Sequence, residues 1–114
     1  MIKPDDPRDL VLNLLPRSVC AIQVASVITD WGGRIIAWGW NGIGPTGYGL
    51  CAERHAIGRG NKTRYRYGTI YVAGRYKRNN RAVHAKPCKD CQQVIDSYRM
   101  TVLFRDRDGE WRPE

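Results

Sequence analysis

Long hydrophobic segments are absent from this sequence. No stretch of its 114 residues approaches the roughly 18 consecutive apolar residues that a transmembrane helix needs. The beginning of the chain, from Met1 to Asp6, is polar and acidic, whereas a secretory signal peptide would carry an apolar segment there. We therefore expect a cytoplasmic protein that has no membrane partner.

Cysteine is also scarce, and the four cysteines would pair as disulfides only in an oxidising compartment. Without an export signal, metal binding is the better interpretation. The length allows one modest hydrophobic core, and we expect a single domain over residues 1–114. A domain of this size would gain buried surface by forming a homo-oligomer, although no segment identifies an interface.

Acidic residues are missing from Arg54 to Lys89, a stretch that contains eleven Lys or Arg. The basic excess of the chain, whose net charge is +8, therefore lies in this stretch. Two motifs within it, Arg64-Tyr65-Arg66-Tyr67 and Arg75-Tyr76-Lys77-Arg78, interleave cations with aromatic rings. This pattern is typical of surfaces that bind single-stranded nucleic acid. A basic surface that aids only solubility, or a few arginines that hold one nucleotide phosphate, would give the same pattern.

Three of the cysteines stand in two short motifs, Cys51-Ala52-Glu53 and Pro87-Cys88-Lys89-Asp90-Cys91. Cys88 and Cys91 are about one helical turn apart, so both sulfurs can point the same way from the first turn of a helix that Pro87 opens. Cys51 is expected to open a second helix. A helix N-terminus favours thiolate over thiol, and the thiolate is the form that binds a metal. We expect the two N-termini to converge on one metal ion.

Three thiolates give a tetrahedral zinc three protein ligands and leave the fourth position for water. Glu53, two residues after the first cysteine, is placed to move the protons of that water. We therefore predict one catalytic Zn²⁺ per chain. A closed zinc knot would need a fourth ligand, for which Cys20, His55 and His84 are the candidates. A redox pair of Cys88 and Cys91 would leave Cys51 unexplained.

Together these motifs resemble the cytidine deaminase superfamily, over about Ala21 to Phe104. The segment around Cys51 is similar to nucleoside-type members that use cysteine as the first ligand, and Gly39-Trp40-Asn41 is similar to tRNA adenosine deaminases and nucleotide deaminases. The resemblance implies a zinc-dependent hydrolytic deaminase with a mixed sheet covered by helices. It implies the following roles: Cys51, Cys88 and Cys91 as zinc ligands, Glu53 as acid and base, and Asn41 as a sugar contact.

Two departures from the family pattern bear on the substrate. Free-nucleoside deaminases usually carry an acid two residues after this asparagine, and Asn41-Gly42-Ile43 has none, which argues against a free nucleoside. The chain also has an insertion over residues 73–86, where many relatives pass almost directly from strand to Pro-Cys.

The resemblance implies an α/β fold in three layers, with a central mixed sheet of about five strands flanked by helices and the zinc site at two helix N-termini. Hydrophobic periodicity and turn residues place the individual elements. We expect helices over 5–15, from 51 to about 58–60 and from 87 onward, and strands over 21–29, 34–40, 68–76, 81–85 and 101–104. The last strand should lie beside the strand over 68–76 through a right-handed crossover. The charged tail, 105–114, is expected to be loosely ordered.

These observations favour hydrolytic deamination of cytosine to uracil in single-stranded DNA or RNA. The main alternative is deamination of a free cytosine nucleotide; a tRNA adenosine deaminase and a non-catalytic zinc-stabilised nucleic-acid binder are further alternatives. Cys20 is interpreted as a small buried hydrophobe and His55 as a packing residue. The candidate substrate contacts are Asn41, Trp40, Ala52, Arg75, Tyr76 and His84.

Overall fold

The computed structural model describes residues 6–43 and 49–114 of the chain. Within these residues, a five-stranded sheet has the strand order β2-β1-β5-β6-β7. The main elements are α1 (Pro7–Leu14), β1 (Ile22–Thr29), β2 (Ile35–Trp40), α2 (Ala52–Arg59), β5 (Thr69–Tyr76), α3 (Lys89–Ser97), β6 (Thr101–Arg105) and β7 (Trp111–Pro113). The shorter elements are the 3-10 helices Leu15–Arg17 and Lys62–Arg64 and the paired strands β3 (Gly42–Ile43) and β4 (Gly49–Leu50).

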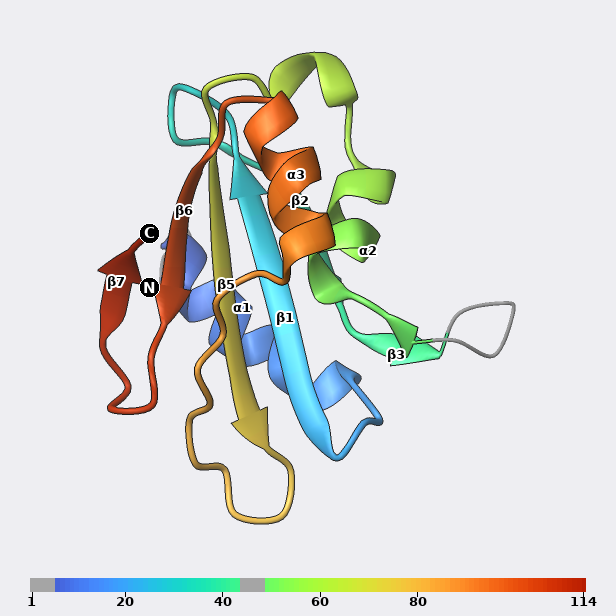
Figure 1. Ribbon diagram of the computed structural model, residues 1–114, viewed down its shortest axis with the longest axis vertical. Helices are drawn as coiled ribbons and strands as arrows, with labels where there is room; N and C mark the ends of the chain where they lie inside the picture. The colour runs from blue at the N-terminus through green and yellow to red at the C-terminus, as the bar shows by residue number, and fades with distance from the viewer. Residues whose placement is uncertain (1–5, 44–48) are drawn as a thin grey trace, which may run out of the picture.

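Helices cover both faces of the sheet, with α1 on one side and α2 and α3 on the other (Figure 1). Each face has its own hydrophobic cluster. Val11 and Leu14 of α1 pack with Val27 of β1 on one face, while Ile57 of α2 and Ile95 of α3 pack with the other. The predicted three-layer α/β fold is therefore confirmed. All helices of the described segments are too short or too polar to cross a membrane.

The sheet is mixed because its central strands pair in both senses. β1 pairs antiparallel with β2 and with β5, whereas β5 pairs parallel with β6. The predicted position of the last core strand, beside β5 after an intervening helix, is confirmed. Helix α2 follows the β3–β4 pair and α3 follows the segment after β5, and both helices lie on the same face of the sheet with their N-termini near each other (Figure 1).

Helix α1 has a capped N-terminus. Asp6 is the N-cap, and its carboxylate accepts a hydrogen bond from the Arg8 backbone N–H at 2.9 Å. Pro7 occupies the first helical position, where its missing N–H costs nothing. Asp5, included in the predicted helix, lies outside the described residues.

Two predicted features after β5 are wrong. The tail forms β7, which pairs antiparallel with β6, and the Trp111 ring lies 6.2 Å from the Tyr71 ring in an edge-to-face arrangement. A turn with Gly109 at φ +81° reverses the chain before β7, and burial of an aromatic ring orders a segment that its charges alone would leave in solvent. The strand expected over 81–85 is reduced to a single bridge between Arg75 and Ala82.

The close packing of β2 against α2 depends on Gly39. A Cβ atom at this position would lie 2.5 Å from the Ala56 backbone nitrogen and 2.8 Å from the His55 Cβ. We expect Gly39→Ala to lower the free energy of unfolding by about 1–3 kcal/mol, because backbone atoms cannot move aside easily.

Urea unfolding of Gly39→Ala beside Gly58→Ala tests this expectation. Gly58 lies in the exposed part of α2, and an added Cβ there meets nothing within 4 Å. Gly58→Ala should therefore be neutral or should stabilise the protein by up to about 1 kcal/mol, through helix propensity. If the free energy of unfolding fell equally in Gly39→Ala and Gly58→Ala, the loss would not come from a specific contact between β2 and α2.

Candidate active site

Three cysteine sulfurs come together at the N-termini of two helices. Cys51 is the N-cap residue of α2, Cys88 is the N-cap residue of α3, and Cys91 lies in the first turn of α3. Their sulfur atoms all lie within 4.8 Å of one another. The backbone thus brings together two motifs that are separated by more than thirty residues in the chain, as the spacing of the cysteines predicts.

Helix α2 is anchored to the sheet next to this cluster. The Ser26 hydroxyl of β1 donates a hydrogen bond of 2.8 Å to the Ala52 carbonyl, and both groups are buried. Because Ala52 lies between Cys51 and Glu53, this bond holds the first turn of α2 against β1. The two functional side chains therefore project from a backbone that is fixed by a central strand.

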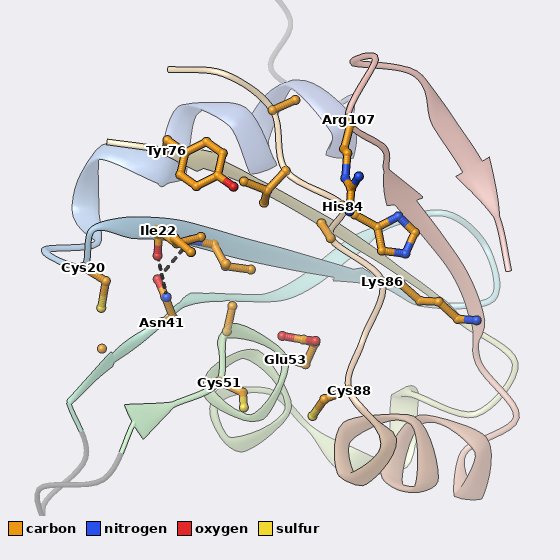
Figure 2. Close-up of a pocket in the computed structure, with 16 residues that line it drawn as sticks. Cys20, Ile22, Asn41, Cys51, Glu53, Tyr76, His84, Lys86, Cys88 and Arg107 are labelled. Atoms are coloured by element: carbon orange, nitrogen blue, oxygen red, sulfur yellow. Dashed lines mark hydrogen bonds between the residues drawn. The ribbon is translucent and has the colours of Figure 1, made fainter. Parts of the chain in front are cut away.

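Glu53 is buried, with 6% of its surface exposed. Figure 2 shows its carboxylate on the floor of a cavity, close to Cys51 and Cys88. Burial raises the pKa of this carboxyl above its ordinary value, because the ionised form loses hydration. A carboxyl whose pKa moves toward neutrality is better suited to take up and release a proton in a catalytic cycle.

The thiols differ in their environments. Burial raises the pKa of the Cys91 thiol, and the negative charge of Glu53 raises it further. Burial also raises the pKa of Cys51. By contrast, the backbone N–H of Cys91 lowers the pKa of Cys88, which is exposed. Three thiolates beside a buried carboxylate would repel one another strongly unless a cation lay among them.

These properties fit one zinc ion. A tetrahedral zinc with Zn–S bonds of about 2.3 Å places its sulfurs about 3.8 Å apart, which is compatible with a cluster whose sulfurs lie within 4.8 Å. Among the residues that the structure describes, no further metal-ligating group joins this cluster. The donor set therefore leaves room for a ligand that the protein does not supply, as in catalytic rather than closed zinc sites.

A cavity of about 620 Å³ opens above the cluster and has room for a nucleoside-sized molecule. Cys51, Glu53 and Cys88 lie at its base (Figure 2). The walls come from the start of β1, the end of β2, the end of β5, the segment that precedes α3 and the turn that follows β6. A substrate in this cavity would meet the metal site and the buried carboxylate together.

Comparison with known proteins decides the family. Residues 10–104 match the family described as the cytidine and deoxycytidylate deaminase zinc-binding region. The chain belongs to this family. A search of curated proteins found no match. The predicted membership of the cytidine deaminase superfamily, and with it a zinc-dependent enzyme, is confirmed.

Solved structures of cytidine deaminases share the fold. The enzyme from Burkholderia pseudomallei is 18% identical, with a TM-score of 0.72 over 99% of this chain and 92% of that one. The enzyme from Mycobacterium leprae is also 18% identical, with a TM-score of 0.66 over 99% of this chain and 94% of that one. At this level of identity, the likeness concerns the fold of the deaminase.

Asn41 lines the deaminase cavity, but most of its side chain is used within the protein. Its Oδ1 accepts hydrogen bonds from the Ser18 hydroxyl at 2.6 Å and from the Val24 N–H at 2.9 Å. Its Nδ2 donates to the Ile22 carbonyl at 2.9 Å (Figure 2). Within the described residues, one amide N–H of Asn41 is left for a substrate. The residue therefore also fixes the end of β2 against β1.

The structure brings some of the other predicted substrate contacts to the cavity and not others. Ala52, Tyr76 and His84 line it, whereas Trp40 and Arg75 do not. Trp40 points to the opposite side, where its ring packs edge-to-face on His55, with centroids 4.8 Å apart, and under the Arg17 and Arg59 guanidinium groups. Successive side chains of a strand point to opposite faces, so a tryptophan next to Asn41 is turned away from the cavity.

Several cavity residues were not predicted. Cys20, interpreted as a buried hydrophobe, is only partly buried and lines the cavity, as do Lys86 and Arg107. The position of Lys86, directly before Pro87, is a usable signal, because a residue next to a metal-binding turn tends to lie near the site. Arg107 has no such signal, since a turn between β6 and β7 brings it to the cavity.

Proposed function

We propose that this deaminase acts on the cytosine of a free nucleoside or nucleotide and converts it to uracil. The observation that carries this proposal is the separation of the two basic aromatic motifs in space. They stand before and at the end of β5, whose eight residues span Thr69–Tyr76. At about 3.3 Å per residue, roughly 25 Å of strand separates them, so they do not form one short strand-binding surface around the cavity.

The basic aromatic motif over residues 64–67 is also less accessible than its sequence suggests. Tyr65 is fully buried, and its hydroxyl donates a hydrogen bond of 2.7 Å to the Ile57 carbonyl near the end of α2. Tyr67 is exposed, with the Arg66 guanidinium 5.0 Å from its ring centroid. A single exposed tyrosine at the far end of β5 offers no stacking platform next to the cavity.

Several arginines of the basic stretch are engaged within the protein. Arg64 pairs with Asp30, and the Arg75 Nε donates a hydrogen bond of 2.8 Å to the Gln23 Oε1. Arg59 lies over the rings of two tryptophans. These contacts favour a structural role for those cations over a continuous phosphate track. The cytidine deaminases with similar folds further support a small substrate.

The chain's residues suit hydrolytic deamination, in which water oxygen replaces the amino group of cytosine and ammonia leaves. Cys51, Cys88 and Cys91 would hold zinc, which when bound supplies a polarised water as nucleophile. The Glu53 carboxylate would take a proton from that water and deliver a proton to the departing amine. Asn41 would orient the substrate through its remaining N–H. The cavity walls would exclude competing water from the reacting ring.

Single-stranded nucleic acid is the second candidate substrate, because of one feature at the cavity. The Tyr76 ring lines the cavity and is 37% exposed, with the Arg78 guanidinium 5.5 Å from its centroid. A ring and a cation in this position could hold a base and a phosphate of a strand whose neighbouring cytosine enters the cavity.

A direct assay separates the two candidates. The zinc-loaded protein is given cytidine, deoxycytidine, deoxycytidine monophosphate and cytosine-containing single-stranded DNA and RNA oligonucleotides, and the products are read by mass. We expect conversion of at least one small molecule at a higher kcat/KM than that of any oligonucleotide. Conversion confined to oligonucleotides would overturn the proposed function and favour the strand-binding candidate.

A further inference from the structure

One wall of the cavity carries three nitrogen-bearing side chains. His84 and Lys86 come from the segment between β5 and α3, and Arg107 comes from the turn between β6 and β7. Figure 2 shows the three on the side of the cavity opposite Cys20 and Asn41. The Ala85 N–H donates a hydrogen bond of 3.2 Å to the Arg105 carbonyl, which joins the two segments that provide the wall.

We propose that His84, Lys86 and Arg107 form a phosphate-binding wall that selects a cytosine nucleoside monophosphate over the corresponding nucleoside. This inference deepens the proposed function and rests on it. A wall with one guanidinium and one ammonium group matches the charge of a phosphate, and charge-assisted hydrogen bonds to such groups are stronger than neutral ones. Base recognition would lie at the metal site and phosphate recognition at this wall.

The orientation of His84 supports this assignment. Its Nδ1 lies 3.0 Å from the Asp106 Oδ1, and its ring packs edge-to-face on Phe104 with centroids 5.1 Å apart. These two contacts hold the imidazole and occupy Nδ1, which donates to the Asp106 carboxylate. Nε2 is the ring nitrogen left to face a ligand, and it donates to a phosphate when the imidazole carries both of its protons. Figure 2 shows the ring beside Lys86 and Arg107, where Nε2 can act with them.

Two carboxylates next to Arg107 in the chain, Asp106 and Asp108, share the Arg112 guanidinium. Asp106 accepts a hydrogen bond of 2.8 Å from the Arg107 backbone N–H and pairs with the Arg112 Nε at 3.0 Å. Together with the His84 contact, these bonds hold the pKa of Asp106 at about 2. Among the described residues, no carboxylate lies within ion-pair distance of Lys86 or Arg107. Lys86 and Arg107 are therefore cavity-lining cations that these carboxylates do not hold in an ion pair.

The segment that carries two of the wall residues is placed by a turn at the end of β5. His84 and Lys86 follow this turn, which returns the chain from Tyr76 to the cavity.

The test compares deoxycytidine monophosphate with deoxycytidine as substrates of the zinc-loaded full chain. We expect the native protein to prefer the monophosphate, in kcat/KM, by roughly 10- to 100-fold. In the double variant Lys86→Gln/Arg107→Gln this preference should fall to within about 3-fold of unity, mainly through a higher KM for the monophosphate. The matched control is Lys62→Gln/Arg34→Gln, which removes two exposed cations outside the cavity and should keep the native preference.

Binding measurements separate failure of this inference from failure of the proposed function. Calorimetry compares binding of uridine monophosphate and uridine, with and without the two substitutions. The phosphate-binding wall would be overturned if the native protein bound the nucleoside more tightly than the monophosphate. It would also be overturned if the native and double-variant proteins preferred the monophosphate equally. Either result would count even if small molecules are deaminated. If only oligonucleotides are deaminated, the proposed function fails, and calorimetric loss of monophosphate binding in the double variant still decides whether the wall binds phosphate. Circular dichroism confirms that both double variants are folded.

Discussion

Glu53→Gln is expected to reduce turnover by about 10²- to 10⁴-fold while leaving zinc content and fold unchanged. The amide has nearly the same shape as the carboxylate but cannot accept and return a proton, and general acid–base groups contribute rate factors of this size. Glu53 is 6% exposed and lines the cavity with Cys51 and Cys88. Because burial raises the pKa of its carboxyl, a neutral amide removes a desolvation cost, and thermal stability should be equal or higher.

The matched control is Glu110→Gln, the same substitution at an exposed position between β6 and β7. It should keep native turnover, which shows that the loss depends on the site and not on the charge of the protein. The measurements are steady-state kinetics, zinc content by atomic absorption and thermal unfolding. If Glu53→Gln deaminates as fast as the native protein, the assignment of Glu53 fails, and a non-catalytic zinc-stabilised binder becomes the better interpretation.

Cys91→Ser is expected to abolish stoichiometric zinc binding and to lower the free energy of unfolding of the zinc-loaded protein by roughly 3–5 kcal/mol. Cys91 is fully buried in the first turn of α3 and lies in the sulfur cluster with Cys51 and Cys88. Loss of one of three protein ligands removes most of the metal affinity, and the free energy of metal binding is part of the free energy of folding. Cys88→Ser should also reduce zinc binding and lower the free energy of unfolding of the zinc-loaded protein.

Cys20→Ser serves as the control for the cysteine substitutions. Cys20 lines the cavity but is not part of the three-sulfur cluster, so its serine variant should retain one zinc per chain. A colorimetric chelator measures the zinc content per chain. Urea unfolding with and without zinc measures the free energy of unfolding. Zinc loss in Cys20→Ser equal to that in Cys91→Ser would mean that the cluster is a closed four-cysteine site, and the open coordination position would be wrong.

The metal site illustrates which features local sequence can determine. Cys88 and Cys91 are one turn apart at the start of a helix, and Glu53 follows Cys51 within one turn, so short-range geometry sets how each group lies relative to its neighbour. The prediction was imprecise at one point: α3 begins at Lys89, and Cys88 is its N-cap residue rather than part of its first turn. The extended N-cap conformation still directs the Cys88 sulfur toward Cys91.

The basic stretch illustrates the opposite case. In the sequence, Tyr65 and Tyr76 look alike, because both stand between cations. In the structure, Tyr65 is fully buried against the end of α2, whereas Tyr76 is 37% exposed and lines the cavity. The partner of Arg75 is Gln23, which is 52 residues away in the chain. Such pairings depend on which strands become neighbours, and periodicity within one segment carries no information about that.

By itself the sequence determined the order of the main helices and strands up to β6, apart from the strand expected over 81–85, and the grouping of Cys51, Cys88 and Cys91 with Glu53. These features depend on side-chain patterns and spacings within single turns or strands. Tertiary structure alone decided the walls of the cavity. It turned Trp40 away, ordered the tail as β7 and carried Arg107 to a position beside His84 and Lys86. The physical reason is that a cavity is formed by segments far apart in the chain, whose relative positions are set by strand pairing and core packing.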